Sequence, residues 1–138
     1  MAGTITATTI QNDSSNPPTF RNNSVEIGTL CRAWVYYNQI SQTILGSFNV
    51  SSVTYIGTGY FKVNLTTALP DTNFSCCGVA AGSGSAGVPA TATFQEWTGT
   101  SAGGGVNNQR TTSAASFRTG RADNDASQDS LVSVQFFR

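Results

Sequence analysis

Histidine is absent from this chain of 138 residues, and lysine occurs once, at Lys62. Without histidine, the chain cannot hold a Ser-His-Asp triad, a histidine general base or a histidine metal ligand. Charge is also sparse and balanced, with seven basic and seven acidic residues. Because nonspecific binding to nucleic acid depends on a basic excess that neutralises phosphates, we expect no nucleic-acid partner.

Long apolar runs are missing as well. No stretch approaches the ~20 apolar residues that a membrane-spanning helix needs. The first residues, MAGTITATTIQNDSS, lack the charged start and the apolar segment of a secretion signal. We therefore expect no membrane partner and an unprocessed product of the cytoplasm.

Cysteine is scarce, with three residues at Cys31, Cys76 and Cys77. An odd number disfavours a closed disulfide framework. Cys76 and Cys77 are adjacent, so in a strand they would point to opposite faces and could not easily share a metal. We interpret all three as small apolar packing residues. A bridge from Cys31 to Cys76 or to Cys77 stays open.

The residues that are abundant favour β-structure, because 49 of the 138 residues are Thr, Ser or Gly. Thr suits a half-exposed strand and Gly suits tight turns. Short alternating segments separated by turn residues predict an all-β fold, either an antiparallel β-sandwich or a jelly-roll-like domain. Strands are predicted at residues 3–10, 29–37, 42–50, 53–56, 60–65, 75–82, 88–97, 110–120 and 130–137. Residues 51–69 predict a hairpin whose short loop, GTG at residues 57–59, supplies Gly for a positive φ, and Gly46 predicts a bulge in residues 42–50. In residues 60–65 the alternation directs Phe61, Val63 and Leu65 to one side.

The first part of the chain differs in composition from the rest. Residues 11–24, QNDSSNPPTFRNNS, are polar and contain Pro17 and Pro18, which favour an extended path. They predict a loop with too little apolar surface to fold alone. We therefore expect an extended N-terminal arm at residues 1–28 and a β-sandwich domain at residues 29–138.

The strand at residues 29–37 is apolar on both faces. Its small set is Cys31, Ala33 and Val35, and its large set is Arg32, Trp34 and Tyr36. A narrow gap between two sheets suits the small set, which would direct the large set outward. Trp, Tyr and Arg are the usual anchors of protein interfaces, so the large set is the candidate interface of a homotrimer. The alternative places Trp34 in the core of the single chain.

Two groups of carboxylates invite a chemical interpretation. Glu96 lies beside Trp97, a neighbourhood that sugar sites use, but a strand-end Glu next to a packed Trp explains it equally simply. Asp123, Asp125 and Asp129 are spaced somewhat like a calcium loop but lack its Gly and its terminal Glu, which favours a solvated turn. We expect no enzyme activity, no cofactor and no metal.

Several segments resemble a domain that recurs in tailed bacteriophages. In that family a strand of the form CRAWV leads to S-x-N-V-S-S-(I/V)-T, then to G-T-G-x-(Y/F)-x-V-x-(F/L)-T-T and P-D-x-N-(Y/F). Here these elements stand at residues 31–35, 47–54, 57–67 and 70–74, and the final Phe137–Arg138 is similar to the family's ending. The turn after the first strand differs, because family members have NFNGTG where this chain has YYNQIS.

The resemblance implies a virion structural protein, most often the distal part of a tail fibre that works as a homotrimer. A short fibre would attach to the tail or baseplate through the arm at residues 1–28. The loops at residues 98–109 and 121–129 would then face a host cell-surface glycan or protein. A capsid decoration (cement) protein that stabilises the head is the alternative. Either protein would be part of the virion and would be assembled in the host cytoplasm.

Overall fold

A computed structural model of the chain describes residues 19–22, 25–81, 92–98, 110–122 and 125–138. The elements in these residues are strands, and the chain divides into two compact units, residues 1–30 and residues 31–138. In the first unit, β1 (Thr19–Asn22) pairs antiparallel with β2 (Val25–Thr29).

The hairpin corrects one prediction, since residues 19–22 were expected to belong to a polar loop. Thr19 pairs with Thr29 and Asn22 with Val25, so two short segments, the second of them rich in β-branched residues, satisfy each other's backbone groups. The strand predicted at residues 3–10 lies outside the described residues. The role of residues 1–28 as an extended arm stays a prediction.

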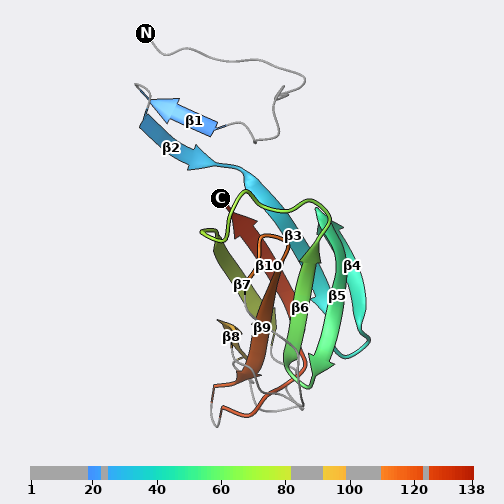
Figure 1. The fold of residues 1–138 in the computed structure, drawn as a ribbon. Helices are drawn as coiled ribbons and strands as arrows, with labels where there is room; N and C mark the ends of the chain where they lie inside the picture. The colour runs from blue at the N-terminus through green and yellow to red at the C-terminus, as the bar shows by residue number, and fades with distance from the viewer. Residues whose placement is uncertain (1–18, 23–24, 82–91, 99–109, 123–124) are drawn as a thin grey trace. The chain divides into compact units, whose positions relative to one another are not determined.

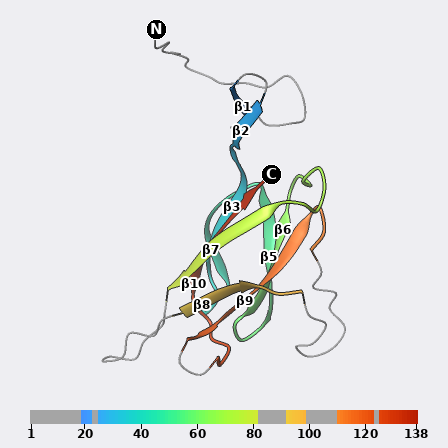
Figure 2. The ribbon, with the colours of Figure 1, turned by 90° about the vertical axis from the view of Figure 1, so that its left-hand side faces the viewer.

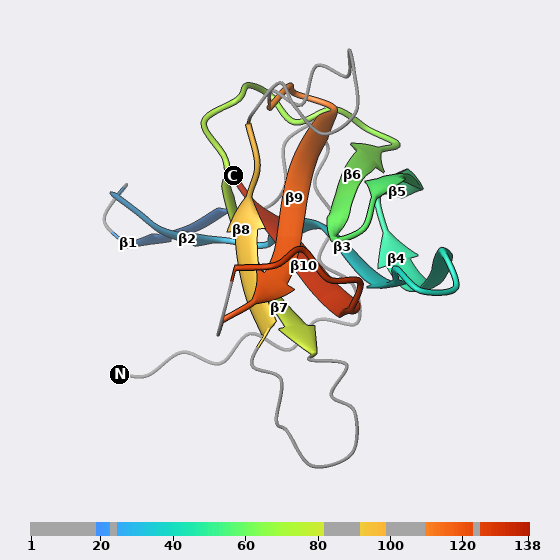
Figure 3. The same cartoon turned by 90° about the horizontal axis from the view of Figure 1, so that it is seen from below.

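The described residues of the second unit form two antiparallel sheets of four strands each. The first sheet has the order β4-β3-β10-β7, with β3 at Cys31–Asn38, β4 at Thr43–Phe48, β7 at Ser75–Ala81 and β10 at Leu131–Phe137. The second has the order β5-β6-β9-β8, with β5 at Val50–Gly57, β6 at Tyr60–Leu65, β8 at Ala92–Glu96 and β9 at Ala114–Arg121. The two sheets form two layers (Figures 1, 2 and 3), so the prediction of an all-β, sandwich-like fold is confirmed.

The core lies between the inward faces of the two sheets. In β6 the alternation predicted from the sequence is confirmed, because Phe61, Val63 and Leu65 are buried. Phe117 of β9 occupies the centre, with ring centroids 5.1 Å from Phe94, 5.6 Å from Phe61 and 6.0 Å from Phe136. These rings come from both sheets, so aromatic packing joins the two layers.

Two hairpins follow the sequence prediction closely. The turn between β5 and β6 contains Gly59 at φ 76°, and a Cβ added there would lie 2.4 Å from the carbonyl oxygen of Thr119. Gly is therefore required both by its backbone angle and by close packing. Between β3 and β4 the register shifts at Tyr36, which pairs with Gly46, so the bulge expected near Gly46 is present.

Asn49 forms the corner at which the chain leaves β4 and enters β5 in the other sheet. Its φ is 55°, a left-handed value that Asn tolerates better than most residues. Its side-chain amide donates to the carbonyl oxygens of Arg32 and Thr67, both at 3.1 Å. Its side-chain oxygen accepts from the backbone N–H of Thr67 at 2.8 Å. One side chain thus ties the corner to β3 and to the end of β6.

We predict that Asn49→Ala lowers the free energy of unfolding by about 2–3 kcal/mol, because it removes three hydrogen bonds and leaves a poorly tolerated φ. Asn49→Gly is the matched control. It loses the same bonds but relieves the backbone, so it should be about 1 kcal/mol more stable than the alanine variant. Urea denaturation at a fixed protein concentration measures both values. An alanine variant as stable as the parent would contradict this role.

Candidate functional site

The outward face of β3 carries the residues that the sequence predicted for an interface. Trp34 is 39% exposed and Tyr36 is 41% exposed, whereas Ala33 and Val35, which alternate with them along the strand, are fully buried. The alternative that placed Trp34 in the core of the single chain is therefore wrong. Arg32, which follows the same alternation, is partly buried at the start of the strand. Their role in a trimer interface stays a prediction.

The sheet register extends this surface across the neighbouring strands. Phe48 of β4 lies opposite Trp34 and is 55% exposed. On the other side of β3, Ser133 of β10 lies opposite Tyr36 and pairs in turn with Val79 of β7, which is 69% exposed. We call Trp34, Tyr36, Phe48 and Val79 the aromatic face.

Charge is nearly missing from the sheet that bears the aromatic face. Its four described strands contain one charged residue, Arg32. The opposite sheet is different, because its strands carry Lys62, Glu96, Arg118 and Arg121. A surface with several large exposed apolar side chains and a single charged residue is typical of a site that binds another protein surface.

The edge of the same sheet is also apolar. β4 is the terminal strand in the sheet order, and both Ile44 and Leu45 are exposed on it. An edge strand that presents unpaired backbone groups and large apolar side chains is prone to pair with another chain. The structure thus brings β4 together with the predicted β3 residues. The sequence predicted a strand at residues 42–50, and the exposure of its large apolar side chains was not predicted.

The ring of Trp34 lies across β4 rather than standing free in solvent. A Cβ added at Gly46 would be 3.3 Å from both Cη2 and Cζ3 of the Trp34 ring. The missing side chain at Gly46 therefore leaves room for the indole. The indole thus packs over the backbone of β4, which covers part of its surface and leaves the rest exposed.

The three cysteines do not form a bridge within the chain. Cys31 is on β3, and Cys76 and Cys77 are on β7, with β10 between these strands. Two strand spacings amount to ~10 Å, which exceeds the ~7 Å limit between the Cα atoms of a disulfide. All three are free, so the open alternative of a Cys31 bridge is wrong.

The adjacent cysteines have different surroundings, as their opposite facing predicts. Cys76 packs against the core, and burial raises the pKa of its thiol to about 12. Cys77 is exposed on the same side of the sheet as the aromatic face, with its Sγ 3.4 Å from Oε1 of Gln135. Because Gln135 pairs with Trp34, Cys77 lies two strands from the indole and can report on whether this face is covered.

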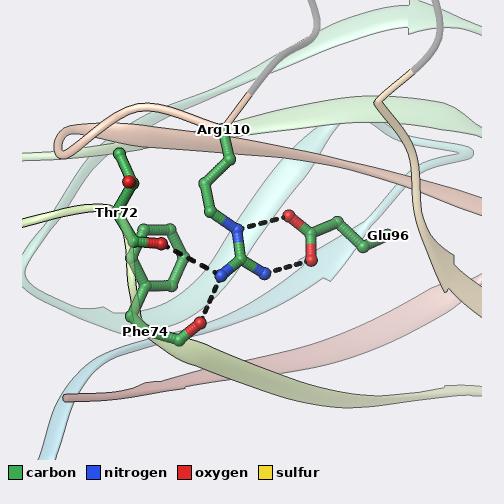
Figure 4. A network of polar contacts seen from close by, with 4 residues as sticks. All are labelled: Thr72, Phe74, Glu96 and Arg110. Atoms are coloured by element: carbon green, nitrogen blue, oxygen red, sulfur yellow. Dashed lines mark hydrogen bonds and ion pairs between the residues drawn. The ribbon is translucent and has the colours of Figure 1, made fainter.

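The carboxylate that the sequence placed beside Trp97 is engaged by an arginine. Arg110 donates from Nε to Glu96 at 2.8 Å and from a terminal nitrogen to the other carboxylate oxygen (Figure 4). It also donates to the carbonyl oxygens of Thr72 and Phe74, and its guanidinium lies 4.3 Å from the centroid of the Phe74 ring. Hydrogen bonding to Glu96 raises the pKa of Arg110. We interpret this group as a clasp that joins the end of β8 to the start of β7.

Of the carboxylates that resembled a calcium loop, the two described ones have separate partners. Asp123 lies outside the described residues. Asp125 pairs with Arg118, whose Nη1 is 2.8 Å from its Oδ1. Asp129 accepts from the hydroxyl of Tyr55 at 3.0 Å and from the backbone N–H of Gly59 at 2.7 Å. Each of these two carboxylates therefore has its own structural role.

Within the described ranges, no three His, Cys, Asp or Glu residues are grouped so that they could hold a metal ion. The same part of the chain contains no helix that is long and apolar enough to cross a bilayer. The aromatic face is therefore the feature with the clearest functional character in the described residues.

We predict that an alkylating reagent modifies Cys77 in a dissociated chain and leaves Cys76 nearly unmodified at pH 8. The thiolate is the reactive form, and a pKa of about 12 leaves Cys76 protonated. Peptide mass mapping after a short exposure measures each site separately. A Cys76 that reacts as fast as Cys77 would mean that β7 opens readily in solution.

In comparisons with known proteins, no family model, no curated protein and no solved structure matches this chain. The functional argument therefore rests on the aromatic face and on the motifs in the sequence.

Proposed function

We propose that this chain is a structural protein of a tailed-bacteriophage virion, a short homotrimeric tail fibre that takes part in adsorption to the host surface. Residues 1–28 attach it to the tail or baseplate. The observation that carries the proposal is the aromatic face, which a single chain leaves exposed and which bears hardly any charge. The protein has no catalytic role in this proposal.

Self-association is the simplest way to cover the aromatic face. Trp34, Tyr36 and Phe48 are all more than a third exposed, although they are large and adjacent in the register. Full burial of a large apolar side chain contributes roughly 1.5–3 kcal/mol, and covering the exposed part of each of these side chains contributes a fraction of that, which favours assembly. A second and a third copy of the chain each bring the same surface, on which Arg32 is the one charge that has to be desolvated or paired.

The segments that resemble the phage family form defined elements of this fold. The CRAWV segment forms β3, and the SFNVSS segment supplies the Asn49 corner. Asp71 of the PDTNF segment accepts two hydrogen bonds from the guanidinium of Arg138, at 2.8 and 2.6 Å. Two distant elements of the family pattern therefore meet in one ion pair.

Adsorption to the host surface is what the resemblance implies. The loops predicted to contact a host glycan or protein are residues 98–109, which lie almost entirely outside the described residues, and residues 121–129. In the second segment Asp125 forms an ion pair with Arg118 of β9. Loops carried by a rigid scaffold are a common way to present a binding surface.

A capsid decoration protein would use the same aromatic face but would bind the head and have no affinity for host cells. Electron microscopy of virions labelled with an antibody against this chain separates the two functions. Label at the tail or baseplate supports the fibre, and label over the head supports the decoration protein. Failure to label virions at all would exclude both.

For assembly, we predict a mass of three chains in solution and a loss of the trimer when the aromatic face is altered. Trp34→Ala should cost about 2 kcal/mol or more in assembly and yield monomers that keep their β-sheet signal. Phe48→Glu should act more strongly, because it places a charge opposite Trp34 in the buried interface. Analytical ultracentrifugation and far-UV circular dichroism, measured together, give mass and fold.

The matched control is Gln95→Ala, which changes an exposed residue on the opposite sheet and should leave the mass unchanged. Cys77 provides an independent readout, since it should resist alkylation in the trimer and react in the Trp34→Ala monomer. A stable parent monomer at micromolar concentration would refute the trimer. A Phe48→Glu protein that remains trimeric would refute this face as the interface.

For attachment, we predict that removal of residues 1–28 leaves a folded β-domain and abolishes incorporation into virions. The two sheets of residues 31–138 enclose their own core, so the truncated chain keeps its melting temperature within a few degrees. Complementation of a phage that lacks the gene, followed by analysis of purified virions, tests incorporation. An unfolded truncation product would show instead that the first unit stabilises the domain.

A further inference from the structure

A buried polar cluster lies inside the sandwich where β3 ends and β10 begins. It contains Tyr37 near the end of β3, Gln39 just beyond that strand, Thr119 of β9 and Ser130 just before β10. All four are buried, with 0–1% of each residue exposed. Asp129, next to Ser130 in the chain, lies at the border of the cluster and binds Tyr55 and Gly59.

Direct hydrogen bonds fix the orientation of the Gln39 side chain. The backbone N–H of Gln39 donates to the carbonyl oxygen of Ser130 at 3.1 Å, and the N–H of Ser130 donates to Oε1 of Gln39 at 3.0 Å. The hydroxyl of Thr119 also reaches Oε1, at 2.8 Å. Because a backbone N–H can only donate, the atom it meets must be the amide oxygen. The amide nitrogen therefore points to the other side.

Three polar atoms in this cluster have no hydrogen-bond partner among the residues that the structure describes: Oη of Tyr37, Nε2 of Gln39 and Oγ of Ser130. Buried polar groups are nearly always paired, because an unpaired one costs roughly 1–3 kcal/mol. One such atom could be tolerated. Gln39 and Ser130 are hydrogen-bonded to each other, and Tyr37 lies two residues before Gln39 on the same inward face. Three unpaired atoms from these residues point to a shared partner.

The chemistry of the three atoms defines that partner. Nε2 of Gln39 is a donor only, which excludes a cation as its neighbour. The negative charge of Asp129 lies close enough to raise the pKa of Tyr37 further than burial alone does, which disfavours an anion. The two hydroxyls can each donate or accept. A small neutral molecule that both accepts and donates satisfies all three.

We propose that this cluster is a binding site for one internal water molecule, which accepts from Nε2 of Gln39 and bridges Oη of Tyr37 and Oγ of Ser130. Internal waters typically make about three hydrogen bonds to such groups. The site joins the β3–β4 turn to the segment that leads into β10. It is independent of the proposed function, because it lies in the core and not on the aromatic face.

A high-resolution crystal structure of the full chain tests the site directly. We expect an ordered water within hydrogen-bond distance of all three atoms in every copy. Tyr37→Phe tests its energetic role, because the ring is retained and only the hydroxyl is removed. If the hydroxyl is bonded to water, the equilibrium constant for unfolding should rise ~5-fold. If the hydroxyl is unpaired, its removal should leave that constant unchanged or lower it.

Tyr55→Phe is the matched control, since it removes a hydroxyl whose direct partner is Asp129. Both variants should lose stability by similar factors when measured by urea denaturation at the same protein concentration. Absence of the water from the crystal structure would overturn the proposal. So would a Tyr37→Phe protein that is as stable as the parent or more stable, while Tyr55→Phe is destabilised.

Discussion

The burial of one face of each sheet against the other is the constraint on which the rest of this structure depends. Phe61, Phe117 and Phe136 come from β6, β9 and β10, and their rings meet in the gap between the layers. Once these rings face inward, the period of two along each strand dictates the facing of every neighbour. A shift of one residue would exchange the buried and exposed sets, so core packing also fixes the register.

The exposed aromatic face is a consequence of that constraint. β3 has to insert its small residues, Ala33 and Val35, into the gap beside the Phe rings, and Trp34 and Tyr36 are then directed outward. The indole finds partial cover because Gly46 leaves space for it on β4. The same sheet carries little charge and ends in an apolar edge strand. Core packing and the proposed assembly are therefore linked through the alternation of a single strand.

Polar side chains stabilise the corners and strand ends that lie outside the apolar core. Asn49 fastens the corner between the sheets, Arg110 clasps Glu96 to the loop before β7, and Arg138 binds Asp71. At the other polar site, Gln39 and Ser130 bond to each other inside the core. Each of these residues joins segments that are far apart in the chain. They act where strands end and the backbone ladder no longer pairs every donor and acceptor.

Sequence alone determined the strand class, most strand positions after residue 29, the Gly59 turn and the bulge near Gly46, whereas it left two alternatives for Trp34 between which the structure decided. The features that it determined follow from local rules, because alternation and turn chemistry act over a few residues. The tertiary structure alone decided that Phe117 is central, that β10 separates Cys31 from Cys77, and that Phe48 and Val79 join the face of Trp34. It also paired β1 with β2, where composition had predicted a loop. These features depend on which strands become neighbours, and strand pairing between distant segments is set by the packing of the whole core rather than by local propensity.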